Sequence, residues 1–261
     1  MTLPIAWFAT ARGTSSRLLF EKVQTAIEAG ELDAQIVVAF CNRERGQSEN
    51  TDAYLNAVAA AGVPIETLSS KAWRERSGGA TSKPGTPLPQ WRHDFDTAVY
   101  ERIAPYRPTI GVLAGYMLIA TAALCERLPL LNLHPAEPGG PIGTWQEVIR
   151  VLIEQRAERS GMMIQRATTA LDRGPIATWC RYSTRGGPLD ALWAARSGPP
   201  SDEEPLFPAL RELGVQREPH FLVASLRALA DGRAPLPPLT GRGPELDLTA
   251  DVERLLKKKG R

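Results

Sequence analysis

The chain has 261 residues, of which 43% are hydrophobic and 23% charged, and its formal net charge is +2. This composition is typical of a soluble globular protein, and the small net charge gives no reason to expect a nucleic-acid partner. The three cysteines lack the CxxC spacing of a zinc site and indicate a reducing compartment. The longest nearly apolar run, Ile110 to Cys125, spans 16 residues, whereas a membrane-spanning helix needs about 20. We therefore expect a cytoplasmic protein with no signal peptide, membrane segment or metal.

The first half of the chain alternates short apolar runs with helical patterns. We expect strands at 5–9, 35–40, 63–68, 110–114 and 128–133, with helices at about 18–29, 51–61, 91–102 and 118–126. Such alternation favours an α/β fold, in which a mostly parallel central sheet is covered by helices on both faces.

The second half is less regular. We expect a helix from Thr144 to about Glu158, strands at 160–166 and 176–182, and a helix at about 219–231. Segments rich in Gly, Ser, Thr and Pro near 74–90 and 185–208 are predicted to be inserted loops, the second with a short helix around 189–195. We expect one domain over residues 1–236 and an extended tail over 237–261 with a small helix near 252–258.

A loop of small residues, Thr10 to Ser16, follows the first predicted strand and opens a helix. The free backbone N–H groups at a helix N-terminus favour a phosphate or carboxylate, and Arg12 or Arg17 could add positive charge. The alternative is that Ser15 or Ser16 is only an N-cap. The loop is neither a GxGxxG motif nor a P-loop, so the two interpretations stay open on this pattern alone.

Asn132 and His134 come at the end of the predicted strand 128–133, where parallel sheets bind their ligands. Two residues apart in an extended chain, they share one face, and both can donate hydrogen bonds to a developing oxyanion. The alternative is that Asn132 caps a turn and His134 packs beside Pro135.

The order of these landmarks resembles the folate-dependent formyltransferases, most closely their phosphoribosylglycinamide formyltransferase branch in purine synthesis. The similarity covers roughly residues 3 to 236. It is carried by Arg12-Gly-Thr-Ser-Ser16, Leu113-Ala-Gly-Tyr-Met117, Asn132-Leu-His-Pro135, Ser160-Gly161 and Leu171-Asp-Arg-Gly-Pro-Ile176. The resemblance implies the Rossmann-like three-layer sandwich of the formyltransferase fold.

The resemblance also implies a reaction, in which an amine attacks the formyl carbon of the co-substrate 10-formyltetrahydrofolate. Asn132 and protonated His134 would bind the oxyanion, and Asp172 would hold the imidazole and help to move a proton. No metal is needed. The substrate phosphate would bind at Arg12, Gly13, Thr14, Ser15 and Ser16. The folate would bind at Arg92, Tyr116, Met117, Leu118, Ile119, Leu171 and Gly174.

Two departures from the family pattern bear on the substrates, Glu137 on the acceptor and Leu118 on the folate. Glu137 lies in a shortened loop after His134, and Leu118 replaces an arginine that commonly follows the Met. The favoured acceptor is glycinamide ribonucleotide. The alternatives are an amino sugar or other amine, transfer to water, or a catalytically silent folate- or nucleotide-binding relative. The partners expected are small molecules, with no nucleic acid or membrane, and the sequence leaves open whether the chain is a monomer or a homodimer.

Overall fold

The computed structural model describes residues 2–81 and 86–259. Residues 82–85 of the predicted loop near 74–90 and residues 260–261 of the predicted tail lie outside these ranges. The chain divides into two compact units, of which the first comprises Met1–Asn132 and Arg166–Gly174 and the second Leu133–Gln165 and Pro175–Arg261. Within the described ranges, no helix has both the length and the apolar character needed to cross a membrane.

The first unit contains parallel strands in the order β3-β2-β1-β4-β5. They are β1 (Leu3–Ala9), β2 (Ala34–Cys41), β3 (Ile65–Thr67), β4 (Ile110–Leu113) and β5 (Leu130–His134), whose last two residues fall in the second unit. All five were predicted to within a few residues. Most are short runs of buried apolar residues, as expected for strands covered on both faces.

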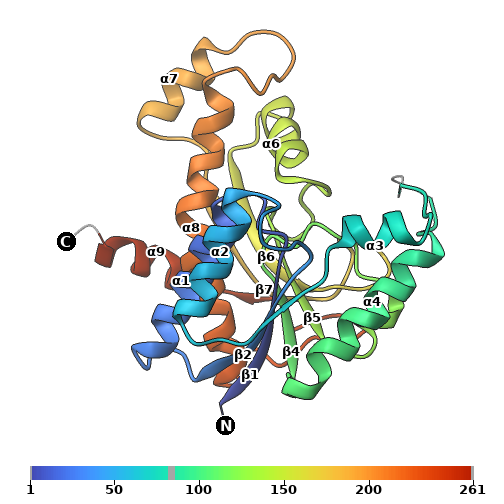
Figure 1. The fold of residues 1–261 in the computed structure, drawn as a ribbon. Coiled ribbons are helices and arrows are strands. Elements are labelled where there is room, and N and C mark those ends of the chain that lie inside the picture. The colour runs from blue at the N-terminus through green and yellow to red at the C-terminus, as the bar shows by residue number, and fades with distance from the viewer. Residues whose placement is uncertain (1, 82–85, 260–261) are drawn as a thin grey trace. The chain divides into compact units, whose positions relative to one another are not determined.

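Helices cover both faces of this sheet, as Figure 1 shows. Side chains alternate along β1, so Trp7 packs with Phe20 and, through it, with Tyr54 on one face, while Phe8 packs with Phe40 on the other. The helices of the unit are α1 (Ser15–Glu28), α2 (Glu49–Ala60), α3 (Ser70–Arg76), α4 (Gln90–Ile103) and α5 (Ala122–Cys125), with a 3-10 turn at Ala104–Tyr106. The three-layer, Rossmann-like α/β architecture is therefore confirmed.

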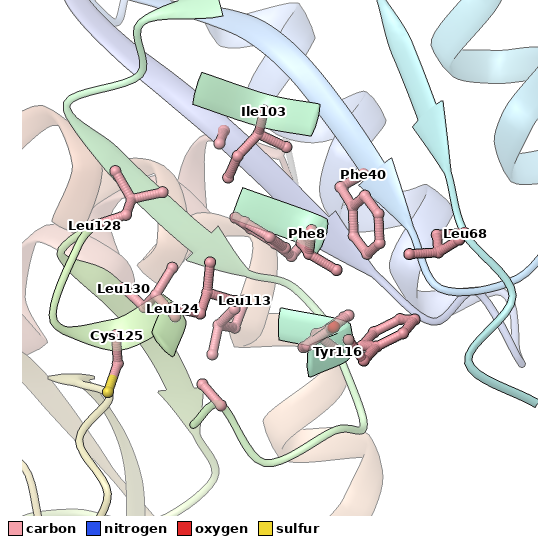
Figure 2. Close-up of a cluster of buried hydrophobic side chains, with 14 of the residues drawn as sticks. Phe8, Phe40, Leu68, Ile103, Leu113, Tyr116, Leu124, Cys125, Leu128 and Leu130 are labelled. Atoms are coloured by element: carbon pink, nitrogen blue, oxygen red, sulfur yellow. The ribbon is translucent and has the colours of Figure 1, made fainter. Parts of the chain in front are cut away.

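The core between the sheet and α4 is a cluster of buried apolar side chains (Figure 2). Phe8 and Phe40 from the strands contact Tyr116, and Phe40 also contacts Phe95 of α4. Burial of one large apolar side chain stabilises a fold by roughly 1.5–3 kcal/mol. This packing holds α4 and the segment that follows β4 against the sheet.

The second unit has a different strand arrangement, in which β6 (Arg159–Arg166) is antiparallel to β7 (Ile176–Ser183) and β7 is parallel to β8 (Leu246–Asp247). Its helices are α6 (Trp145–Glu154), α7 (Pro188–Ala195), α8 (Leu206–Ala230) and α9 (Thr249–Lys259). Thr144 and Glu147 form a capping box at the start of α6, which explains the predicted helix start. Because β8 pairs with β7, the stretch predicted as an extended tail contributes a strand and a helix to this unit.

Several predicted boundaries are wrong. The helix predicted over 118–126 is only the four-residue α5, because Thr121 is extended and holds the N-cap position, with its N–H donating to Asp96 rather than to a helical carbonyl. α6 ends at Glu154 because Arg156 adopts a left-handed conformation that reverses the chain. The first residues of the predicted loop 74–90 belong instead to α3, which ends at Arg76. Ser69 caps the start of that helix.

The helix predicted to start near Pro219 begins instead at Leu206 and passes through Pro219. A proline inside a helix costs about 3 kcal/mol. Leu206, Phe207 and Leu210 bury their side chains against α6 and Trp193, and this burial offsets the cost. The predicted inserted loop 185–208 does contain the short helix α7.

Candidate functional site

The candidate site residues of the first unit follow the carboxyl ends of its parallel strands, which meet at one edge of the sheet. The strand order reverses between β1 and β4, which are adjacent in space although β2 and β3 lie between them in sequence. Ligands of open α/β sheets bind outside such a switch point. The loop after β1 and the segment after β4 both start there.

The loop after β1 leads directly into α1. The helix begins at Ser15, and Thr14 holds the N-cap position without a side-chain hydrogen bond to the first turn. Ser15 and Ser16 are therefore first-turn residues, and the N-cap alternative considered for them is wrong. Residues 12–15 are exposed, whereas Ser16 is buried. The first turn of α1 holds no acidic residue, so no side chain of that turn neutralises the positive end of the helix dipole.

Two side chains from the start of α2 hold this loop in place. The buried Thr51 donates its hydroxyl to the Ala11 carbonyl over 3.2 Å, and Asn50 donates its amide to the Arg12 carbonyl over 3.0 Å. Ala11 itself has a left-handed φ of 50°, which is uncommon for a residue with a Cβ atom. The sequence analysis missed both donors, because nothing local connects them to a loop about 40 residues away.

The segment after β4 lies directly beside this loop. The Thr10 amide donates to the Gly115 carbonyl over 3.1 Å, and the Thr10 hydroxyl accepts from the Met117 amide over 2.8 Å. A Cβ atom on Gly115, whose φ is 72°, would lie 2.7 Å from Oγ of Ser16. Glycine is thus required where the two segments meet. The structure therefore brings together the predicted phosphate-binding loop and the start of the predicted folate segment.

The predicted folate residues 116–119 differ in how they face solvent. The Tyr116 ring is buried against Phe8, and burial raises its pKa well above the ordinary value. Met117 is 57% exposed, and Leu118 and Ile119 are half-buried. Tyr116 can therefore contribute only its backbone to a ligand, and Met117 is the most exposed side chain of the four.

Arg92, which the resemblance places among the folate-binding residues, is a buried residue of α4. Its side chain is 3% exposed and lies 3.4 Å from the fully buried carboxylate of Asp96, one turn further along α4. The same guanidinium donates to the Ile119 carbonyl over 2.9 Å. Burial raises the pKa of Asp96, although the charge of Arg92 opposes that shift. The side chain of Arg92 thus contacts the backbone of the predicted folate segment. Its partner Asp96 is a residue that the sequence analysis missed.

Asn132, in the middle of β5, contacts Asp172 in the turn after β6. The Asn132 amide nitrogen lies 3.3 Å from a carboxylate oxygen of Asp172. Asp172 has a left-handed φ of 52°, which aspartate tolerates better than most residues. The turn depends on Gly174, because a Cβ atom there would overlap the Arg166 carbonyl, and it leaves Leu171 51% exposed.

His134 ends β5, two residues beyond Asn132, and belongs to the second unit. It is buried, and its Nε2 atom lies 2.9 Å from the Pro141 carbonyl oxygen. Because a carbonyl can only accept, Nε2 carries a proton in this contact. His134 therefore has a defined hydrogen-bond partner rather than only packing beside Pro135.

Glu137 braces the shortened loop after His134. Its carboxylate pairs with Arg159 at 3.1 Å and with Arg181 at 3.4 Å, and its carbonyl accepts from the Gly140 amide over 2.8 Å. A Cβ atom on Gly161 would lie 2.8 Å from the Glu137 Cβ. The residue that departs from the family pattern thus ties the loop to β6 and β7.

Among the residues that the structure describes, no group of three or more His, Cys, Asp or Glu side chains could hold a metal ion. The three cysteines are buried as free thiols, and burial raises the pKa of Cys41 to about 11 and that of Cys180 to about 12.

Comparison with solved structures shows where this fold recurs. Glycinamide ribonucleotide transformylase 1 from Symbiobacterium toebii superposes with a TM-score of 0.66 at 19% identity, over 94% of this chain and 95% of that chain. The phosphoribosylglycinamide formyltransferase of Coxiella burnetii superposes with a TM-score of 0.59 at 21% identity, over 90% of this chain and 90% of that chain. A formyltetrahydrofolate deformylase from Pseudomonas syringae pv. tomato has a TM-score of 0.62 at 16% identity, over 90% of this chain and 63% of that chain.

A search of curated proteins found no match. The family model described as formyl transferase, however, matches residues 5–181, which is more than half of the chain. This chain therefore belongs to the formyl transferase family.

Proposed function

We propose that this protein transfers the formyl group of 10-formyltetrahydrofolate to an amine, and that the amine is glycinamide ribonucleotide in cytoplasmic purine synthesis. The observation that carries the proposal is the contact of Asn132 with Asp172, with His134 two residues further along β5. These are the three residue types that formyl transfer to an amine requires for oxyanion binding and proton movement. The family of the chain supports the same reaction class.

In the proposed reaction, the amine nitrogen forms a bond to the formyl carbon, and the bond from that carbon to folate N10 then breaks. The formyl oxygen becomes negative in the tetrahedral intermediate. One hydrogen of the Asn132 amide donates to Asp172, which orients the group, and its second hydrogen is assigned to the oxyanion. Asp172 takes part in moving the proton from the amine to N10, directly or through water.

Protonated His134 supplies the second donor to the oxyanion. The imidazolium has two N–H groups, and one of them donates to Pro141 in this structure. The partner of that N–H, Pro141, lies in the loop braced by Glu137, and this contact helps to set the orientation of the imidazole. The loop braced by Glu137 would then influence the catalytic step.

The acceptor phosphate is assigned to the first turn of α1. Residues 12–15 are exposed there and the helix start has no side-chain cap, so its N–H groups can bind an anion. Of the folate, the pterin is assigned to the main chain of 116–119 and to the turn from Leu171 to Gly174. Main-chain recognition of the pterin tolerates changes of side chain, and the replacement of an arginine by Leu118 bears on the glutamate tail of the folate or on the donor itself.

The test is the absorbance of the deformylated folate product, with 10-formyltetrahydrofolate as donor and glycinamide ribonucleotide as acceptor. We expect acceptor-dependent turnover that His134→Ala and Asp172→Asn each reduce by about 10²-fold or more. Turnover only with an amino sugar or another amine would keep the class and reject the acceptor. Formate release without any amine would indicate hydrolysis, as the name of the Pseudomonas deformylase describes for that protein. Binding of folate without turnover would reject an enzymatic role.

A further inference from the structure

The buried pair Arg92–Asp96 lies on the face of α4 that packs against the segment after β4. Both side chains are almost fully buried, at 3% and 0% exposed. Taking two charges out of water costs more than their attraction returns unless further hydrogen bonds satisfy them. No residue within 2–81 or 86–259 accepts a hydrogen bond from the Nε atom of Arg92, which adds to this cost. A pair maintained at such a cost calls for a reason beyond stability.

The two side chains share a target, which is the backbone that joins β4 to α5. Arg92 donates to the Ile119 carbonyl over 2.9 Å, and the other Asp96 carboxylate oxygen accepts from the Thr121 amide over 2.6 Å. Hydrogen bonds to charged groups are the stronger ones in proteins. The ion pair therefore clamps one carbonyl and one N–H that lie two residues apart.

This clamp and the Thr10 hydroxyl hold opposite ends of the same segment. Thr10 accepts from Met117, and the ion pair binds Ile119 and Thr121. The exposed Met117 and the half-buried Leu118 lie at or next to the Thr10 end. The segment is not helical, so its shape depends on these side chains rather than on a backbone ladder.

We propose that Arg92 and Asp96 are positioning residues, which set the backbone of residues 117–121 in the shape that receives the pterin. This inference rests on the proposed function, and it revises the folate-binding role that the family resemblance implied for Arg92. Arg92 acts on the folate through the Ile119 carbonyl, and its charge does not contact the anionic tail of the folate.

The test uses the double variant Arg92→Met with Asp96→Leu, because removing both charges leaves no unpaired charge in the core and lets the chain fold. Asp94→Asn is the matched control, since Asp94 is exposed on the same helix and accepts only from Gln90 among the contacts seen. Circular dichroism and thermal melting confirm that both variants are folded. Calorimetry then measures the dissociation constants of tetrahydrofolate and of tetrahydropteroate, which lacks the glutamate tail.

We expect the double variant to bind both compounds about tenfold more weakly, as when two hydrogen bonds that order a binding segment are lost. The control should bind like the parent. Amide hydrogen exchange of residues 116–121 without ligand should speed up in the double variant, which a contact between Arg92 and the folate tail would not explain.

Three results would overturn the inference. Weaker binding of tetrahydrofolate with unchanged binding of tetrahydropteroate would show that Arg92 contacts the tail directly. Unchanged binding of both by a folded double variant would show a purely structural pair. A parent protein that binds neither compound would instead reject the proposed function, and with it any role of the pair in folate binding.

Discussion

Asn132 and Asp172 are 40 residues apart in the sequence, yet the Asn132 amide nitrogen lies 3.3 Å from a carboxylate oxygen of Asp172. The left-handed backbone of Asp172 is tolerated by asparagine as well as by aspartate. Asp172→Asn should therefore preserve the turn and an acceptor for the Asn132 amide, while removing the carboxylate charge that the proposed proton relay uses.

For Asp172→Asn we expect a fall in kcat of about 10²- to 10⁴-fold, the usual loss when a general acid–base group is removed. Steady-state kinetics with saturating folate and amine measure it. The melting temperature should stay close to that of the parent, which separates chemistry from stability. A variant with kcat within threefold of the parent would remove Asp172 from the proposed relay.

Asn50→Ala should weaken binding of a phosphorylated acceptor. The Asn50 amide donates to the Arg12 carbonyl and so helps to hold the exposed loop before α1. Because one such hydrogen bond contributes about 1 kcal/mol, the KM for the acceptor should rise about fivefold. The KM for the folate should change less.

The matched control is Asn56→Ala, which removes an exposed asparagine from the same helix. The Asn56 side chain accepts a hydrogen bond from Arg45 and, within the described part of the chain, makes none with the loop before α1. This variant should leave both KM values unchanged. Equal effects of the two substitutions would mean that α2, and not the loop contact, determines acceptor binding.

Glu137→Gln should loosen the loop that carries Pro141. Glu137 loses its charge toward Arg159 and Arg181, both of which are partly exposed, so the unfolding free energy should fall by only about 0.5–1 kcal/mol. The effect on kcat should be larger than this loss suggests, since the loop holds the hydrogen-bond partner of His134. Denaturant unfolding and kinetics on the same sample measure the two effects.

High salt supplies an internal check on Glu137. Salt screens exposed ion pairs, so the stability difference between parent and Glu137→Gln should shrink at about 1 M salt, where the Debye length is about 3 Å. A difference that does not depend on salt would point to loop packing rather than to the arginine pairs.

The buried thiols predict a loss of stability in alkali. Burial raises the pKa of Cys180 to about 12, against an ordinary value of 9.0 in the unfolded chain. Below pH 9.0 the thiol is protonated in both states and costs no stability. As the pH rises toward 12, the thiol ionises in the unfolded chain but not in the folded one, so the unfolding free energy falls. Cys180→Ala should therefore reduce the slope of unfolding free energy against pH in this window.

Thiol labelling at pH 8 tests the burial of the cysteines independently of the unfolding free energy. Because all three cysteines are buried in the folded chain, they should react with a thiol reagent far more slowly than after unfolding. Rapid labelling of a cysteine without unfolding would show local opening of the strand or helix that carries it.

The sequence alone determined where most strands lie and which turns break them. Runs such as Ile110–Leu113 are short, apolar and bounded by turn residues, so local patterning is enough to identify them. The order of Asn132, His134 and Asp172 likewise indicated the family, because motif spacing is a property of the chain. The start of α6 was predictable for the same reason, since its cap is built from neighbouring residues.

Tertiary structure decided which side chains face a ligand and which are buried. Arg92 reads as an accessible charge in the sequence, yet it is buried and its guanidinium contacts Asp96 and the Ile119 carbonyl. α8 runs through Pro219 because burial against α6 and Trp193 outweighs a local preference. Hydrogen bonds and packing between residues far apart in sequence are worth as much as local propensity, and only the folded chain brings those residues together.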